Sequence, residues 1–599
     1  MAETMKERKD MDPQYMWDLS TLFKNDEEWN NALPELNEMI KKLPEYQGKL
    51  NNAKTIRKFF DFDTHLGRKL SDFYCYASLR NCEDTRDSDA QAMEAKAYQV
   101  YTAYATAISF AEPEILSLDE EVLESIVHSE DLKPYAFNMQ KLLDQKPHVL
   151  SAKEEALLAA FTETLGAPSK ISESLQDADM TFESVTDSNG EVHELNQSNY
   201  ILLQMSEDRT LRLNAFKSFY KGFKQHINTF AFTYNACIKE AVAEAQVRHY
   251  ESSRAMSMAY EHVPGVVYDS LVDTVRKFMP EMYRYVRLIK QMLGLDELHY
   301  YDVYTPLVAG SSKSYTYEEA QQMVLDAVTP LGKDYVNRVK QAYKDRWIDV
   351  YPNNGKRGGA FSSGTYDSNP YILTSFTGTL DSVSTIAHEM GHSQHTWLSN
   401  HTQTPQNADY TLFVAEVAST VNENLLVEQL LQKTTEPKER LALLNHYLEG
   451  FKGTVYRQTM FAEFERDAHA MAERGEAITA ASMNTLYKNL IKDYFGEDLV
   501  IDDEVQYEWA RIPHFYRPFY VYKYATSYCA AVALSEAILN NEDDAVKKYL
   551  EFLSMGGSAY PLDELKHAGV DFSTPEPVSR ALTKFSQILD DVEETLKKL

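Results

Sequence analysis

The spacing of apolar residues constrains the fold of this chain more than any other feature of its sequence. Through most of the 599 residues, apolar side chains recur every three or four positions, and glycine (22) and proline (20) are scarce. Because an α-helix has about 3.6 residues per turn, this spacing gathers apolar side chains on one helix face. The sequence therefore predicts a mainly α protein, whose core is made of packed amphipathic helices.

The predicted helices cover most of the chain. They are the ranges 74–81, 90–111, 134–165, 199–245, 268–293, 381–398, 408–431, 436–474, 480–494 and 519–539. Weak alternation around the Asn-Gly pair at 189–190 predicts a short hairpin within 180–195, since Asn-Gly favours a tight turn. No change in composition marks a linker. We place one boundary near residue 200, which gives an N-terminal helical domain (1–200) and a catalytic domain (201–599).

The segment 348–377 departs from the helical pattern. It contains the breakers Pro352 to Gly355, Gly358-Gly359 and Asn369-Pro370, with short β-rich runs between them such as 371–376. Short apolar runs bounded by turn residues are typical of strands. We therefore expect a small β-sheet, packed beside the helix that follows.

That helix carries the pattern H-E-x-x-H at residues 388–392. Histidines at positions i and i+4 share one helix face, so His388 and His392 can bind the same metal ion. Glu389 points about 100° away, within reach of a water on that ion. The alternative is a solvated helix that carries these residues by chance. We expect a zinc site with Glu389 as the general base.

Catalytic zinc takes a third protein ligand and keeps an open position for water. His395 lies on the same helix face, but its Cα is about 10 Å along the axis from that of His388, which makes the reach strained. Glu416 is the better candidate, because it interrupts the apolar stretch 412–419 and a buried carboxylate needs a partner. A lysine or arginine partner is the alternative for Glu416. Glu423 is either an orienting acceptor for one of the histidines or an exposed side chain.

A tyrosine-rich run at 514–524 offers hydrogen-bond donors that could stabilise an oxyanion. Tyr516, Tyr520 and Tyr524 share helical spacing, as a row of donors along a groove would. The alternative is an aromatic stripe in the core. The abundance of tyrosine in the chain, with 39 residues, favours that alternative.

Together these motifs resemble those of oligoendopeptidase F, a bacterial branch of the thimet-oligopeptidase-like metallopeptidases. The resemblance rests on residues 356–361, 370–373, 388–392, 415–419, 514–516 and 522–524, and it extends to 556–558 and 568–571. It implies a helical ellipsoid with a deep central channel and a small β-sheet beside a zincin-like active-site helix. It also implies that the substrates are short peptides, because such a channel excludes folded proteins.

By motif match, the resemblance implies that His388, His392 and Glu416 hold one zinc ion (Zn2+) per chain, with Glu389 as the base. The resemblance adds no role for Glu423.

The resemblance also implies roles outside the metal site. His514 and Tyr524 match positions that contact the substrate or stabilise the oxyanion, and we expect Tyr516 and Tyr520 to contact the substrate. The backbone around residues 371–376 and a second strand are expected to pair with the peptide. That second strand is formed by Gly358, Gly359, Ala360 and Phe361.

The composition excludes other classes of protein. A formal net charge of −31 is unfavourable for nucleic-acid binding, because phosphate contacts need clusters of lysine and arginine. The four cysteines show no C-x-x-C pair and no disulfide pattern, which indicates reduced thiols. The first ten residues lack an apolar signal region, and no apolar run approaches the ~20 residues of a membrane span. We expect a cytoplasmic protein that binds neither membrane nor nucleic acid.

The function predicted from the sequence is zinc-dependent hydrolysis of internal peptide bonds in short oligopeptides. One alternative is a metallocarboxypeptidase of related helical fold. The other is a non-catalytic peptide-binding protein that carries a vestigial motif. The sequence indicates neither the cleavage preference nor the oligomeric state.

Overall fold

The computed structural model describes residues 5–308 and 313–599, and in those ranges the chain is mainly α, which confirms the predicted fold class. The chain forms two compact units. Unit 1 comprises Met1–Val149, Lys313–Gln429 and Leu534–Val570, and unit 2 comprises Leu150–Ser312, Leu430–Ala533 and Asp571–Leu599. Each unit thus combines three separate segments, whereas the sequence predicts one boundary near residue 200. That boundary stays a prediction, as do the ellipsoid and its central channel.

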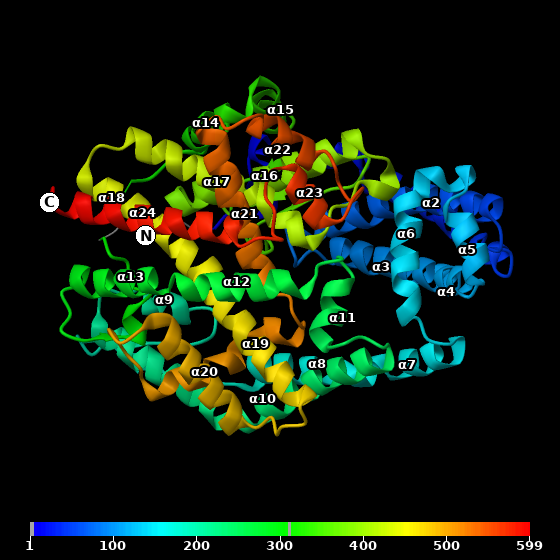
Figure 1. The fold of residues 1–599 in the computed structure, drawn as a ribbon. Coiled ribbons are helices and arrows are strands. Elements are labelled where there is room, and N and C mark those ends of the chain that lie inside the picture. Colours follow the sequence, from blue (N-terminus) through cyan, green and yellow to red (C-terminus); the bar gives the residue numbers. More distant parts are fainter. Residues whose placement is uncertain (1–4, 309–312) are drawn as a thin grey trace. The chain divides into compact units, whose positions relative to one another are not determined.

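Unit 1 combines the N-terminal helices with a small sheet and the helix of the H-E-x-x-H motif (Figure 1). Its helices are α1 (Asp26–Ile40), α2 (Ala53–Glu83), α3 (Ser88–Ile108), α4 (Ala111–Leu116), α5 (Glu120–Val127), α6 (Ala136–Gln145), α14 (Tyr317–Ala327), α15 (Lys333–Lys344), α16 (Leu380–Thr402), most of α17 (Leu412–Lys433), α22 (Ala545–Leu553) and α23 (Pro561–His567).

The segment predicted to be β-rich forms a three-stranded sheet. Its order is β4 (Ile348–Asp349), β6 (Tyr371–Leu373), β5 (Phe361–Ser363), with β6 parallel to β4 and antiparallel to β5. The central strand β6 is fully buried, whereas β5 is half-buried at the edge. Helix α16 contacts both β5 and β6. The expected small sheet beside the motif helix is therefore present.

A hydrophobic core joins this sheet to the N-terminal helices. Trp29 stacks on Phe73 of α2 with ring centroids 4.3 Å apart, and both belong to a buried cluster that also contains Tyr371 and Leu373 of β6. Close packing of large side chains leaves little freedom to shift. The N-terminal helices thus fix the sheet against which α16 lies.

Unit 2 is built around α10 (Arg209–Val247), which has 39 residues. Phe216, Phe219, Tyr220 and Phe223 are buried on it at three- and four-residue spacing, which is the helical pattern that the sequence predicts. The other helices of this unit are α7 (Ala152–Leu165), α8 (Ala167–Ser174), α9 (Tyr200–Gln204), α11 (Ser253–Ala259), α12 (Gly265–Lys277), α13 (Met279–Met292), α18 (Pro437–Gly450), α19 (Arg457–Glu473), α20 (Ala480–Phe495), most of α21 (Tyr522–Leu539) and α24 (Glu576–Leu596).

Unit 2 also contains two short pairs of strands. β1 (Val185–Thr186) and β2 (Val192–His193) form the antiparallel hairpin predicted at the Asn-Gly turn. β3 (Leu298–His299) and β7 (Leu499–Val500) pair in parallel.

Three of the predicted helices are divided in the structure, two of them at prolines. The third is the range 199–245, where α9 ends at Gln204 and α10 begins at Arg209. The range 134–165 is not one helix, because α6 ends at Gln145 and Pro147 lies in a 3-10 turn before α7. The range 268–293 divides into α12 and α13, with Pro280 in the first turn of the second helix. Proline has no backbone N–H and fits best in the first turn of a helix, which explains why these two ranges are divided.

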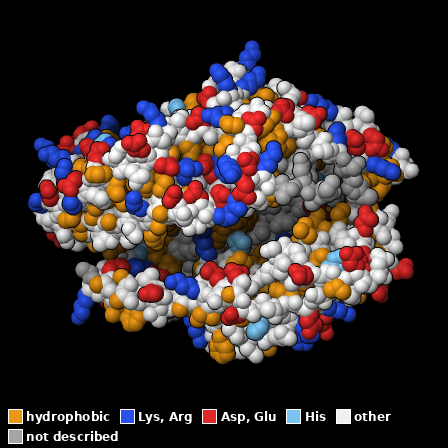
Figure 2. Space-filling view, turned by 180° about the vertical axis from the view of Figure 1, so that it is seen from behind, with side chains coloured by type: hydrophobic (Ala, Val, Ile, Leu, Met, Phe, Trp, Pro, Cys, Tyr) orange, Lys and Arg blue, Asp and Glu red, His pale blue; other side chains and the backbone are white. Residues whose placement is uncertain are grey.

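The charges of the chain are mixed on its surface. On the face drawn in Figure 2, acidic and basic side chains are interspersed, without one extended basic patch. Cys75, Cys82, Cys237 and Cys529 are all free and buried. Among the described residues, no helix combines the length and the apolar character that a membrane crossing requires.

Candidate metal centre

Helix α16 begins at a capped N-terminus. The side chain of Thr379 accepts a hydrogen bond from the N–H of Ser382 at 3.1 Å, and Asp381 adds negative charge to the first turn. The helix continues to Thr402. His388 and His392 therefore lie in its middle, where one regular turn separates them and brings both imidazoles to the same face.

Helix α17 passes very close to α16 at Gly391, the small residue inside the motif. A Cβ atom on Gly391 would lie only 2.5 Å from the carbonyl oxygen of Ala418, so only glycine fits this crossing. The side chain of Asn422 then donates a hydrogen bond of 3.0 Å to the carbonyl of Ala387. These contacts hold α17 in the position from which Glu416 reaches the two histidines.

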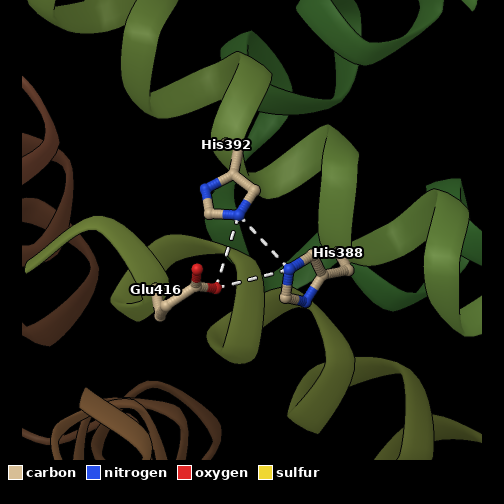
Figure 3. A group of neighbouring side chains, drawn as sticks. All are labelled: His388, His392 and Glu416. Atoms are coloured by element: carbon tan, nitrogen blue, oxygen red, sulfur yellow. Dashed lines mark hydrogen bonds and ion pairs between the residues drawn. The ribbon is translucent and has the colours of Figure 1, made fainter. Parts of the chain in front are cut away.

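The side chains of His388, His392 and Glu416 converge on one point (Figure 3). The two Nε2 atoms lie 3.2 Å apart, and each is 3.4 Å from Oε2 of Glu416. Tetrahedral zinc with bonds of about 2.0–2.1 Å separates its ligand atoms by about 3.3–3.4 Å. The spacing of the three atoms therefore fits a tetrahedral zinc ion.

The electrostatics of this group favour a positive charge. Nδ1 of His388 lies 3.3 Å from Oε2 of Glu423, whose other oxygen, Oε1, accepts a hydrogen bond of 3.3 Å from the hydroxyl group of Ser384. Burial opposes protonation of His388, but hydrogen bonds with Glu416 and Glu423 outweigh it and raise its pKa well above the usual range. Burial likewise opposes ionisation of Glu416, yet the two imidazoles lower its pKa. A cation bound between these side chains is thus compensated by two carboxylates.

Glu389 lies beside this group with different surroundings. Its side chain is buried, with 6% of the residue exposed, and its Oε2 has no hydrogen-bond partner among the described residues. Burial raises the pKa of the Glu389 carboxyl above the usual range. A carboxyl group whose pKa is raised toward neutrality suits a residue that takes up and releases a proton.

His395, the rival third ligand, belongs to the core. It is 1% exposed and stacks on Tyr410 with ring centroids 3.7 Å apart and planes 3° apart. Burial lowers the pKa of His395 to about 3. Among the described residues, the possible metal-binding group that includes His388 and His392 contains Glu416 and not His395.

Of the two segments expected to pair with a peptide, only 358–361 lies at the edge of the sheet. Residues 371–373 form the central strand β6, which already pairs with β4 and β5, so the prediction that this strand pairs with the peptide is wrong. Gly358, Gly359 and Ala360 are exposed and lead into β5, which begins at Phe361. The hydroxyl groups of Ser362 and Ser393 are 2.8 Å apart and connect β5 to α16.

The tyrosine-rich run belongs to unit 2 and is not one helix. The prediction that Tyr516, Tyr520 and Tyr524 form a helical row is wrong: Tyr516 ends a 3-10 turn (Pro513–Tyr516), and α21 starts only at Tyr522. Pro518 and the left-handed Phe519, with φ of 55°, interrupt the helix between them.

Three side chains of this run nevertheless come together. The rings of His514 and Tyr520 are 6.3 Å apart, those of His514 and Tyr524 are 5.9 Å apart, and those of Tyr520 and Tyr524 are 5.3 Å apart. Burial, with a smaller effect of Arg517, lowers the pKa of His514.

The hydroxyl group of Tyr516 is turned toward another part of unit 2. It lies 2.7 Å from that of Thr233, and its ring is 5.9 Å from that of Tyr234. The geometry thus groups Tyr520, rather than Tyr516, with His514 and Tyr524.

The fold and the metal-binding group define a class of protein. A mainly helical chain that brings two histidines of H-E-x-x-H and a glutamate of the next helix to one point has the design of a metal-dependent peptidase.

The comparison with known proteins agrees. Residues 202–584 match the model of peptidase family M3, and residues 114–182 match that of oligopeptidase F. Oligopeptidase PepF of Bacillus subtilis is 43% identical over 600 residues, covering 100% of this chain and 90% of its own. Group B oligopeptidase PepB of Streptococcus agalactiae is 39% identical, covering 99% and 98%. The chain belongs to peptidase family M3, in its oligopeptidase F branch.

Solved structures support the same assignment. Oligoendopeptidase-F from Enterococcus faecium is 36% identical and superposes with a TM-score of 0.75, over 96% of this chain and 100% of its own. A protein from Chlamydophila abortus, 34% identical, reaches a TM-score of 0.93 over 99% and 100%. The chain is therefore a peptidase of a metal-dependent family, and its substrates are peptides.

Proposed function

We propose that this chain is a zinc-dependent endopeptidase that cuts internal bonds of short oligopeptides. The observation that carries the proposal is the separation of 3.2–3.4 Å between the two Nε2 atoms and Oε2 of Glu416. That separation matches tetrahedral zinc, and the donor set of two imidazoles and one carboxylate is typical of catalytic zinc in peptidases.

In this proposal, each residue near the ion has one role. His388, His392 and Glu416 hold one zinc ion, which supplies a Lewis acid for the peptide carbonyl and lowers the pKa of water. The carboxylate of Glu389 takes a proton from the attacking water and passes that proton to the leaving amine. Glu423 accepts a hydrogen bond from Nδ1 of His388, so that Nε2 of this ring keeps its lone pair for the metal.

The peptide is held by groups outside the metal site. The exposed backbone of 358–361 and the edge strand β5 pair with the backbone of the substrate. Tyr524 donates a hydrogen bond to the oxyanion, and His514 and Tyr520 contact the substrate. Tyr516 contributes through the packing of this region in unit 2.

The test is the analysis of cleavage products by mass spectrometry. A pool of peptides with an acetylated N-terminus and an amidated C-terminus is incubated with the enzyme, with and without a chelator. We expect internal cuts that disappear with the chelator and return with added zinc. The same peptides with a free C-terminus are the comparison: cleavage of these alone would identify a metallocarboxypeptidase, and metal binding without cleavage of either set would identify a peptide-binding protein.

We also propose that the enzyme works in the cytoplasm, as the four free, buried cysteines favour. Its only proposed partners are peptide substrates.

A further inference from the structure

The chain makes an unfavourable turn between His514 and Tyr524. The segment 517–521 leads from the 3-10 turn that carries His514 to α21, which carries Tyr524. Within it, Phe519 has φ of 55°, a left-handed conformation that side chains with a Cβ rarely adopt. Such a conformation persists only where surrounding groups hold it in place.

Glu465 of α19 holds this turn from one side. One oxygen of its carboxyl group accepts a hydrogen bond of 2.8 Å from the backbone N–H of Phe519. The side chain is fully buried, and its other oxygen has no hydrogen-bond partner among the described residues. Burial raises the pKa of the Glu465 carboxyl well above the usual range. Whether it is ionised or protonated, a carboxyl group can accept this hydrogen bond through one oxygen.

Two further side chains of unit 2 hold the same turn. The ring of His469, one helical turn after Glu465 on α19, lies 4.7 Å from the ring of Phe519. The hydroxyl group of Ser257 donates a hydrogen bond of 2.8 Å to the carbonyl of Pro518. The carbonyl of Pro518 and the N–H of Phe519 belong to one peptide group, and the two hydrogen bonds hold this group at both its oxygen and its nitrogen.

The turn sets the direction of the next side chain. Tyr520 follows Phe519 directly, and its ring lies 5.3 Å from that of Tyr524. If Phe519 relaxed to an ordinary negative φ, the backbone at Tyr520 would rotate and these rings would separate. The hydrogen bond of Glu465 goes to the backbone of Phe519 and not to a side chain proposed to contact the substrate.

We propose that Glu465, assisted by Ser257, is a positioning residue of the enzyme: it holds the left-handed turn at Phe519 and thereby places Tyr520, Tyr524 and His514 for the peptide. This inference rests on the proposed function, in which these three side chains contact the substrate or the oxyanion.

The first test compares two substitutions in the full-length, zinc-loaded protein. Glu465→Gln keeps an oxygen that accepts the Phe519 N–H, whereas Glu465→Leu removes it. Removing a single oxyanion donor costs about 10²–10³-fold in kcat, so a misplaced donor in Glu465→Leu is expected to cost at least about tenfold. Glu465→Gln should stay within about twofold of the parent, and bound zinc should be unchanged in both. Parental kcat in Glu465→Leu, or equal damage in both variants, would overturn the inference.

Glu463 provides a matched control on the same helix. It is buried too, but it bonds to Arg276 at 2.9 Å and to Tyr494 at 3.0 Å. We expect Glu463→Gln to lower the melting temperature without a selective loss of kcat. If Glu463→Gln lowers kcat as much as Glu465→Leu does, the effect at Glu465 is general destabilisation and the inference fails.

A double-mutant cycle separates this inference from the proposed function. If Glu465 acts through Tyr524, Glu465→Leu should lower kcat much less in a Tyr524→Phe background than in the parent. Fully multiplicative losses would contradict the inference alone. A Tyr524→Phe variant with parental kcat would contradict the proposed role of Tyr524.

Ser257→Ala covers the case in which Glu465→Leu does not fold. It removes the hydrogen bond to Pro518 and leaves Glu465 intact. We expect kcat to fall several-fold with unchanged zinc content, and an unchanged kcat would count against the positioning of this turn.

Discussion

Two histidines of helix α16 lie in opposite environments. On α16, His388 lies 3.3–3.4 Å from the carboxylate oxygens of Glu416 and Glu423, and hydrogen bonds with these groups raise its pKa. His395, seven residues on, stacks on Tyr410 in the core, where burial lowers its pKa to about 3. We infer that the surroundings of a histidine, rather than its spacing along the helix, decide whether it can hold a metal ion. Facing carboxylates compensate the charge of a cation, which an apolar core would reject.

Glu416→Ala changes the metal-binding region most. Without this carboxylate, two imidazoles remain and the ion loses both a ligand and its charge compensation. We expect zinc to be lost on dialysis and activity to fall by about 10³-fold or more. Metal analysis by mass spectrometry, alongside peptide hydrolysis, measures both. His395→Ala is the matched control and should retain zinc; the reverse result would exchange the two assignments.

Glu389→Gln separates chemistry from metal binding. The amide keeps the size of the side chain but cannot take a proton, so kcat should fall by about 10²–10⁴-fold. Bound zinc should remain near one ion per chain. Steady-state kinetics on an internally quenched peptide, with metal analysis of the same sample, tests this expectation. Activity equal to that of the parent would remove Glu389 from the mechanism.

Glu423→Gln is expected to lower the affinity for zinc without removing a proposed ligand. The carboxylate loses its charge and its acceptor strength toward Nδ1 of His388, and such changes cost about 10–100-fold in metal affinity. Competition with a zinc chelator of known affinity measures the dissociation constant. An unchanged affinity would mean that Glu423 only lies near His388.

His395→Leu should have the smallest effect on activity, with kcat and zinc content within about twofold of the parent. Its effect appears in the pH dependence of stability. The pKa of His395 is about 3 in the folded protein and about 6.5 in the unfolded chain. Between these two pH values, His395 takes up a proton only when the protein unfolds. The free energy of unfolding therefore falls as the pH drops below about 6.5, by up to about 1.4 kcal/mol per pH unit.

Removal of His395 removes that contribution, so the loss of stability between pH 6.5 and pH 5 should be shallower in His395→Leu. Urea unfolding at several pH values measures the slope. An equally steep slope in the variant would mean that His395 is not buried as a neutral ring.

The sequence predicts those parts of the fold and of the candidate metal site that depend on the spacing of residues within one helix. Apolar spacing gives most helices, and the i, i+4 spacing of His388 and His392 requires only a regular turn. Glu416 follows from a carboxylate in an apolar stretch, because buried charge needs a partner.

What the sequence does not predict depends on contacts between distant segments. The left-handed Phe519 is held by Glu465, 54 residues earlier, and no local pattern marks that contact. The two units are likewise not visible in the composition. At two of the unit boundaries, the chain continues from one unit into the other within a single helix, α17 or α21, so no linker marks the boundary.

The most direct test of the central claim is anomalous diffraction at the zinc absorption edge, on crystals of the protein purified without added metal. We expect one peak per chain, about 2.0–2.2 Å from Nε2 of His388, Nε2 of His392 and a carboxylate oxygen of Glu416. A peak elsewhere, or a Glu416 carboxylate turned away from two unoccupied imidazoles, would contradict it.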